Sequence, residues 1–125
     1  MNLLLDTHVL LWWLTDPASL SQQAQAAIAS GENLVFVSAA SIWEMTIKSG
    51  LGKLTMPNDL DQQMQIERFD ELPIRIADAR LVATLPALHR DPFDRMLVAQ
   101  ARNNSLILVT RDRLILAYGG KMLRA

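Results

Sequence analysis

The chain has 125 residues, half of them apolar, and a formal net charge of -1 at pH 7. This length can bury a core without a metal or a disulfide staple, so we interpret residues 1–125 as a single domain. The absence of cysteine excludes a disulfide framework and thiolate metal sites, and it is consistent with a reducing compartment. The near-zero net charge gives no global basic field of the kind that attracts nucleic acids.

The amino-terminal stretch MNLLLDTHVLLWWL is apolar, but it lacks the basic segment that opens an export signal. Asp6 and His8 interrupt this stretch well short of the length needed to span a membrane. We therefore expect a cytoplasmic protein with no membrane partner.

Short apolar runs alternate with helical patterns along the chain. Strands are predicted at residues 2–5, 34–37, 71–74 and 106–110, and helices at residues 7–14, 21–30, 39–49, 59–69, 76–85 and 92–103. Ser21 and Ser38 are placed to cap two of these helices. Apolar strands that alternate with helices indicate an α/β fold with a mostly parallel central sheet covered on both faces.

Acidic residues follow the predicted strands. Asp6 ends the first strand, the helix that contains Glu44 leaves the second, and Asp112 comes two residues after the last. Function in parallel sheets gathers outside the carboxyl ends of the strands. We therefore expect these acids to lie near one edge of the sheet.

The stretch HRDPFDRMLVAQA, residues 89–101, contains two further aspartates at the start of a helix. Asp91 precedes a proline and is suited to be the N-cap, and Asp94 has the position of a capping-box acid. However, Leu97, Val98 and Ala101 follow Asp94 at helical spacing, so Asp94 heads the apolar stripe that faces the core. A residue that only caps a helix has no reason to point inward.

Glu44 is a second acid that is predicted to look inward. Ala40, Trp43, Ile47 and Leu51 lie within about 60 degrees of it around the helix, although this helix is apolar on nearly every side. An unpaired buried carboxylate is costly, and several such groups close together are worse. A divalent cation removes this conflict, and oxygen ligands favour Mg²⁺ or Mn²⁺ over zinc.

One or two such ions can activate water for the hydrolysis of a phosphodiester. The sequence contains no G-x-S-x-G, P-loop, G-x-G-x-x-G or H-E-x-x-H motif that would point to other chemistry. Because a metal ion lowers the pKa of bound water, no protein base is required, and we interpret His8 and His89 as polar helix or loop residues.

Several basic residues adjoin the acids. Lys48 lies one helical turn after Glu44, and the arginines beside the aspartates are Arg90, Arg95, Arg111 and Arg113. Ion pairing on solvated helix faces explains any one of them. As a set, Lys48, Arg90, Arg95 and Arg111 are candidates for contacts with phosphate groups beside an acidic pocket.

Apolar residues on three helices leave two interpretations open. Trp12 and Trp13 make the first helix apolar on every side, so its outer face is either buried in the core or covered by another chain. Met45, Met56 and Met64 either fill the core or line a groove for a partner helix.

The segments LLLDTH, SAASIWEMTIK, HRDPFDRMLVAQA and LILVTRD occur together in this order. In them the sequence resembles PIN-domain ribonucleases, and most of all the VapC-type toxins of bacterial toxin–antitoxin pairs. The resemblance spans nearly the whole chain. It implies a three-layer α/β/α sandwich, a metal-dependent endoribonuclease activity on RNA, a cognate antitoxin that blocks the site, and a homodimer.

The resemblance also assigns residues. It implies that the catalytic, metal-binding acids are Asp6, Glu44, Asp94 and Asp112, holding one or two Mg²⁺ or Mn²⁺ ions. It favours Asp94 over Asp91, which remains a helix cap, an acid that supports a metal ligand, or an outer metal contact. It places Thr110 where a hydroxyl orients a carboxylate or a metal-bound water, although a threonine at a strand end is also ordinary.

Two alternatives remain. A receiver-like or phosphatase-like α/β domain also gathers acids at strand ends, but it needs a lysine after a late strand, where LILVTRDRL supplies arginines. A non-catalytic PIN-fold interaction protein should have lost one of the four acids, and none is missing.

Overall fold

The computed structural model describes residues 1–125 and contains a five-stranded, fully parallel sheet. Its strands are β1 (Asn2–Leu5), β2 (Leu34–Ser38), β3 (Asp70–Leu72), β4 (Ile107–Thr110) and β5 (Met122–Arg124). The order across the sheet is β3-β2-β1-β4-β5. The predicted mostly parallel central sheet is therefore confirmed.

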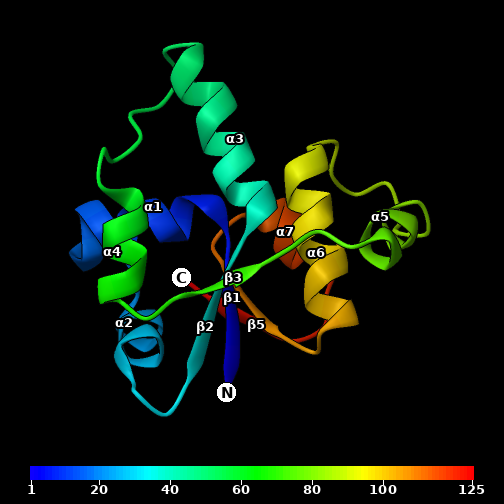
Figure 1. Ribbon diagram of the computed structural model, residues 1–125. Coiled ribbons are helices and arrows are strands. Elements are labelled where there is room, and N and C mark those ends of the chain that lie inside the picture. The colour runs from blue at the N-terminus through cyan, green and yellow to red at the C-terminus, as the bar shows by residue number, and fades with distance from the viewer.

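Helices cover both faces of the sheet (Figure 1). They are α1 (Thr7–Thr15), α2 (Gln22–Ala29), α3 (Ala39–Gly50), α4 (Leu60–Ile66), α5 (Ile76–Val82), α6 (Pro92–Asn103) and α7 (Arg113–Leu116), with a short 3-10 helix at Pro17–Ser19. Helices α1, α2 and α4 lie on one face, and α5, α6 and α7 lie on the other. This is the expected α/β/α sandwich. None of these helices combines the length and apolar character that crossing a bilayer requires.

Alternation along β1 explains why the protein has two hydrophobic cores. Leu3 and Leu5 point into the core beneath α1, α2 and α4, whereas Leu4 points into the core beneath α6. All three side chains are fully buried. Burial of each leucine side chain contributes about 1.5–3 kcal/mol to the stability of the fold. A strand with apolar residues on both faces gains this stability only where helices cover both faces, which is at the centre of the sheet.

Side-chain caps begin the helices at the positions that the sequence indicates. Ser21 and Ser38 cap α2 and α3, as predicted. Asp6, Asp91 and Asp112 cap α1, α6 and α7 in the same way. Such caps satisfy amide groups that have no partner within the helix. Three aspartates are thereby fixed at helix N-termini.

The order of the strands opens a crevice at one edge of the sheet. From β1 the chain proceeds outward to β2 and β3 on one side, and β4 and β5 then fill the other side. The connections after β1 and β4 therefore leave in opposite directions, which creates a topological switch point between these two strands. Leu5 and Val109 are neighbours there, so Asp6 and Thr110 lie at the crevice.

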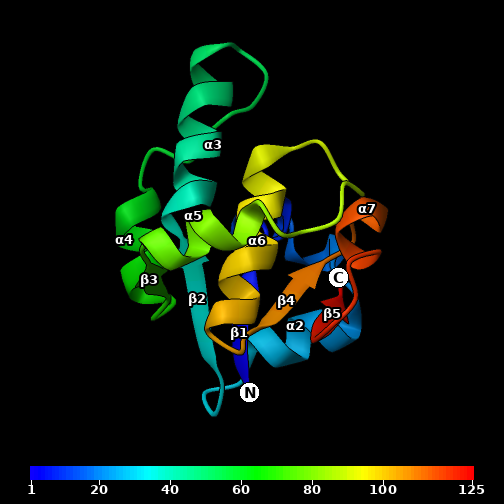
Figure 2. The ribbon, with the colours of Figure 1, turned by 90° about the vertical axis from the view of Figure 1, so that its right-hand side faces the viewer.

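Helix α3 does not pack as the sequence predicts. Trp43, Ile47 and Leu51 were expected on an inward face with Glu44, but they are 59%, 39% and 65% exposed. For Ile47 and Leu51 the reason is that α3 rises from the end of β2 and projects beyond the sheet, so its outer end has little to cover it (Figure 2). Trp43 lies nearer the start of α3, where its ring packs edge-on against Phe93 with 5.2 Å between the ring centroids. Only the first part of the helix is buried, and that part includes Glu44 and Met45.

Two elements at the carboxyl terminus were not predicted. The strand β5 has three residues and α7 has four, which is too short for a periodic pattern. The other predicted helices and strands are present with shifted ends. For example, the strand expected at 71–74 is β3 at Asp70–Leu72, and the helix expected at 59–69 is α4 at Leu60–Ile66.

Candidate active site

Asp6 lies directly after β1, and each of its carboxylate oxygens accepts a hydrogen bond from another residue of the protein. Its Oδ1 accepts a hydrogen bond from the Val9 amide at 2.7 Å, and its Oδ2 accepts one from the Thr110 hydroxyl at 2.5 Å. The residue is only 5% exposed. Burial raises the pKa of Asp6, whereas the hydrogen bonds from Thr110 and Val9 lower it and the nearby charge of Asp112 raises it further.

Thr110 joins Asp6 to Asp112. Its hydroxyl oxygen also accepts a hydrogen bond from the Asp112 amide at 3.0 Å. The Oδ1 atom of Asp112 caps α7 by accepting from the Leu114 amide at 2.8 Å, which leaves Oδ2 toward the crevice. The predicted function of Thr110 in orienting a carboxylate fits this geometry.

Glu44 is 2% exposed and is held at both oxygens. The Thr7 hydroxyl donates to Oε1 at 2.6 Å, and the Lys48 ammonium donates to Oε2 at 2.5 Å. The pKa of Lys48 is raised, first by the hydrogen bond to Glu44 and then by the negative charges of Glu44, Asp91 and Asp94, against partial desolvation. The inward position predicted for Glu44 is therefore observed.

Asp94 is a second acid of the site whose pKa is raised. Burial raises its pKa to about 7, together with the charges of Asp91 and Glu44, while a hydrogen bond from His89 lowers it and the charge of Asp6 raises it. Asp94 therefore lies within electrostatic reach of three other carboxylates. This agrees with the expectation that the acids gather at one edge of the sheet.

Asp91 is the N-cap of α6. Its Oδ1 accepts from the amides of Phe93 at 2.8 Å and of Asp94 at 3.1 Å. The capping-box alternative for Asp94 is not observed, because the Asp94 carboxylate bonds His89, and the Asp91 amide instead contacts His89 Nδ1 at 3.4 Å. Asp94 is thus free of any capping function.

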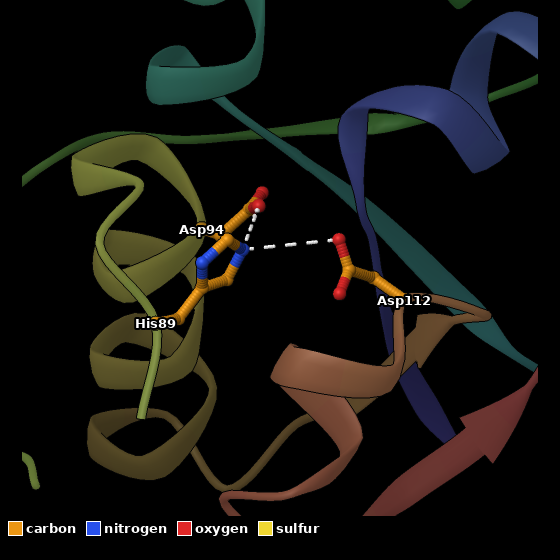
Figure 3. Close-up of side chains that lie close together, drawn as sticks. All are labelled: His89, Asp94 and Asp112. Atoms are coloured by element: carbon orange, nitrogen blue, oxygen red, sulfur yellow. Dashed lines mark hydrogen bonds and ion pairs between the residues drawn. The ribbon is translucent and has the colours of Figure 1, made fainter. Parts of the chain in front are cut away.

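His89 is the site residue that sequence reasoning missed. Its Nε2 lies 2.8 Å from Asp94 Oδ2 and 3.8 Å from Asp112 Oδ2, and one atom from each of these three residues lies within 4.8 Å of the others (Figure 3). His89 is a loop residue, as predicted, but its contact with the two acids was not foreseen. Histidine occurs five residues before Asp94, but the path of the connecting loop has no periodic signal from which this contact follows.

The loop that contains His89 is held by Arg95. The guanidinium donates to the carbonyls of Val82 at 2.8 Å and Pro86 at 3.0 Å, and to the Tyr118 hydroxyl at 3.0 Å. The Tyr118 hydroxyl in turn accepts from the His89 amide at 3.1 Å. Arg95 was predicted to contact RNA phosphate, and these bonds give it a different function in the folded chain.

The other basic candidates differ in how far their charged groups are already bonded within the protein. Arg111 donates to the carbonyls of Ser19 and Ala125, and its guanidinium lies 4.3 Å from the centroid of the Trp12 ring. Lys48 is paired with Glu44 but is one-third exposed. Arg90 is exposed. Of the four predicted phosphate contacts, Arg90 is exposed and Lys48 is partly exposed, whereas the guanidinium groups of Arg95 and Arg111 bond backbone carbonyls.

The donor chemistry of the site fits a divalent cation. Carboxylates that raise one another's pKa favour a nearby positive charge, and oxygen donors of this kind bind Mg²⁺ or Mn²⁺. Asp112 Oδ2 lies 3.8 Å from His89 Nε2, and the hydrogen bonds that Asp112 accepts at the start of α7 go to its other oxygen. The carboxylates of Asp94 and Asp112 that lie against His89 therefore fit a divalent cation chemically.

Comparison with known proteins establishes the family. The family model described as PIN domain matches residues 3–121. The chain belongs to the PIN domain family. This PIN domain is 32% identical over 115 residues to Ribonuclease VapC22 of Mycobacterium tuberculosis, a match that covers 90% of this chain and 88% of that protein.

Solved structures share the fold of this PIN domain at low sequence identity. The crystal structure of VapBC2 from Rickettsia felis bound to a promoter DNA fragment gives a TM-score of 0.70 at 14% identity, covering 100% of this chain and 98% of that chain. A toxin–antitoxin complex from Klebsiella pneumoniae gives 0.64 at 19% identity, with coverage of 97% and 95%. The resemblance to VapC-type PIN proteins is thereby confirmed.

The strand order argues against the receiver-like alternative. Receiver-type doubly wound proteins have the order 2-1-3-4-5, in which β1 lies next to β3. In this PIN domain β1 lies between β2 and β4. The acid that follows β1 therefore lies beside the end of β4 in this fold, and not beside the end of β3 as in a receiver domain.

Proposed function

We propose that this PIN domain is a metal-dependent endoribonuclease of the VapC type, a toxin that a cognate antitoxin neutralises. The observation that carries this proposal is the gathering of Asp6, Glu44, Asp94 and Asp112 near the switch point between β1 and β4. Burial, together with the charges of Asp91, Glu44 and Asp6, raises the pKa of Asp94 there to about 7. The similarity to a VapC ribonuclease supports the choice of RNA as substrate.

The four acids are proposed to hold one or two Mg²⁺ or Mn²⁺ ions. When bound, such an ion supplies a water of lowered pKa and neutralises charge on the scissile phosphate. Asp94 and Asp112 each direct one oxygen into the crevice, and Asp94 must be ionised to act as a ligand. Asp6 is kept in position by Thr110, and Glu44 by Thr7.

Basic residues at the rim are proposed to contact the RNA backbone. Arg90 is exposed next to Asp91, and the Lys48 ammonium lies beside Glu44. An ammonium beside the acids can bind a phosphate oxygen without losing its attraction to the carboxylate. Arg95 and Arg111 are left out of this proposal, because their guanidinium groups are already bonded to backbone carbonyls.

Cellular context follows from the same proposal. We expect the protein to act in the cytoplasm on cellular RNA, to form a homodimer, and to bind its antitoxin over the catalytic edge. The residues 1–125 are proposed to act as one nuclease domain. Light scattering of the purified chain, alone and with the antitoxin encoded beside it, measures both assemblies.

The test is cleavage of a defined single-stranded RNA with added Mg²⁺ or Mn²⁺, with and without a chelator. Wild type is compared with Asp6→Asn and Asp94→Asn, and with Asp61→Asn, which changes an exposed acid on α4. We expect chelation and each of the first two substitutions to abolish cleavage, and Asp61→Asn to retain it. Cleavage that survives both substitutions, or that persists in chelator, would disprove the proposed mechanism.

A further inference from the structure

The chain contains two histidines, and they lie in different surroundings. His89 places Nε2 between carboxylate oxygens of Asp94 and Asp112, with little exposed side chain. His8 is exposed on α1 and packs its ring against Trp12, with 5.8 Å between the ring centroids. Of the two, only His89 has a nitrogen aimed at two of the proposed metal ligands (Figure 3).

We infer that His89 is a nitrogen ligand of the divalent ion, so that the metal site is built from imidazole and carboxylate donors together. This inference rests on the proposed function, because it assigns a further ligand to the same site. It goes beyond a site formed by carboxylates alone. His89 had no assigned function in the sequence interpretation.

The spacing of the three donor atoms supports this inference. Neighbouring ligands of an octahedral ion lie about 3 Å apart when each bond is about 2.1 Å long. His89 Nε2 lies 2.8 Å from Asp94 Oδ2, and the set of three atoms spans no more than 4.8 Å. These are distances at which three atoms can face one ion with small adjustments.

The loop that contains His89 is held in place independently of the acids. The His89 amide donates to the Tyr118 hydroxyl at 3.1 Å, and Arg95 bonds the same hydroxyl at 3.0 Å. Arg95 also donates to the Pro86 carbonyl at 3.0 Å. The loop backbone therefore positions the imidazole ring beside the acids before any metal ion binds, as is usual for preorganised metal ligands.

Ligation leaves the imidazole neutral. In the structure the Asp91 amide faces Nδ1 at 3.4 Å and Nε2 lies 2.8 Å from Asp94 Oδ2, an arrangement that fits the tautomer with its proton on Nε2. A metal bond to Nε2 requires that proton to transfer through solvent to Nδ1, and the long contact with the Asp91 amide is then given up. No proton is lost from the ring in this change of tautomer.

A nitrogen ligand changes which ion the site prefers. Mg²⁺ is a hard cation that takes oxygen ligands, whereas first-row transition ions accept imidazole readily. A site that includes His89 should therefore bind Mn²⁺ more tightly than Mg²⁺. Replacing His89 should reduce the affinity for Mn²⁺ much more than the affinity for Mg²⁺.

Pulsed electron paramagnetic resonance of the Mn²⁺-loaded protein tests the inference directly. A directly bound imidazole gives a ¹⁴N modulation of the Mn²⁺ signal, and histidine labelled with ¹⁵N changes that pattern. We expect the modulation in wild type and in the control His8→Asn, and its loss in His89→Asn. Calorimetry should show Mn²⁺ binding weakened at least tenfold in His89→Asn and not in His8→Asn.

The outcomes separate this inference from the proposed function. Bound Mn²⁺ and RNA cleavage without any nitrogen modulation in wild type would overturn the assignment of His89 and leave the nuclease proposal standing. Nitrogen modulation that persists in His89→Asn would overturn it as well. Failure of wild type to bind Mn²⁺ or Mg²⁺ would overturn both, and the wild-type spectrum decides the matter even if His89→Asn folds poorly.

Discussion

The Thr110 hydroxyl donates to Asp6 Oδ2 at 2.5 Å, although the two residues are 104 positions apart in the chain. This bond crosses the switch point between β1 and β4. The same hydroxyl oxygen accepts from the Asp112 amide at 3.0 Å. One threonine therefore sets the positions of two acids that come from different strands.

Substitution of Thr110 should affect both stability and metal binding. In Thr110→Val the Asp6 carboxylate and the Asp112 amide each lose a partner, which should lower the free energy of unfolding by about 1–3 kcal/mol. Because the hydrogen bond lowers the pKa of Asp6, its loss should raise that pKa further and weaken Mn²⁺ binding. Urea denaturation and calorimetry measure the two effects. Thr110→Ser keeps the hydroxyl and should retain metal affinity, so an equal loss in both variants would contradict this account.

The stability of the metal-free protein should fall as pH rises from about 4 to about 7. The pKa of Asp94 is raised from 3.8 to about 7, so over this range the folded state holds a proton that the unfolded state has released. Unfolding is therefore favoured progressively until Asp94 ionises in the folded state. Thermal melts in chelator should show a smaller decrease for Asp94→Asn, which cannot titrate. A decrease of equal size in both proteins would show that other groups cause it.

Affinity for the divalent ion should rise as the pH passes through the pKa of Asp94. A metal ligand must be deprotonated, and with a pKa of about 7 Asp94 is mostly protonated at pH 6 and mostly ionised at pH 8. We expect Mn²⁺ to bind about tenfold more weakly at pH 6 than at pH 8, since ionised Asp94 is about tenfold scarcer at the lower pH. Titration calorimetry at the two pH values measures this. Equal affinity at both would exclude Asp94 as the titrating ligand.

Lys48 should stabilise the metal-free protein by its contact with Glu44. Lys48→Met leaves the buried Glu44 carboxylate with the Thr7 hydroxyl as its remaining hydrogen-bond partner, which should cost about 1–3 kcal/mol of stability. Bound Mn²⁺ should recover part of this loss by neutralising the carboxylate. Lys53→Met, which changes an exposed lysine beyond α3, is the matched control in urea denaturation. A loss in Lys48→Met that bound Mn²⁺ leaves unchanged would argue that Glu44 is not near the ion.

Arg95 should act on the fold rather than on RNA. Its guanidinium bonds the carbonyls of Val82 and Pro86, and lysine cannot reproduce this forked geometry. Arg95→Lys should therefore lower the free energy of unfolding by about 2 kcal/mol and speed hydrogen exchange in the loop at residues 86–91. Arg90→Lys should change neither. A change confined to RNA affinity in Arg95→Lys would favour the phosphate contact that the sequence suggested.

Much of the fold was predictable because its signals are local. Caps at Ser21, Ser38 and Asp91 depend on residues close in sequence, and the run at 106–110 is apolar enough to indicate a buried strand. By contrast, β5 pairs only with β4, and its three residues give no pattern of their own. Its position is decided by the strand beside it.

The site was predicted in part for the same reason. The acids at strand ends follow from the general geometry of parallel sheets, and Asp94 was distinguished from Asp91 by its helix face. The exposure of Ile47 and Leu51 could not be foreseen, because an apolar stripe does not reveal how far a helix extends past its sheet.

The sequence alone determined the alternation of strands and helices, the N-caps and the set of acids, because each depends on neighbours along the chain. Only the tertiary structure decided that His89 reaches Asp94 and Asp112, and that Arg95 is used to hold the loop. Those contacts depend on the path of a loop packed against Tyr118. No periodicity encodes that path, since it results from packing between segments that are distant in sequence.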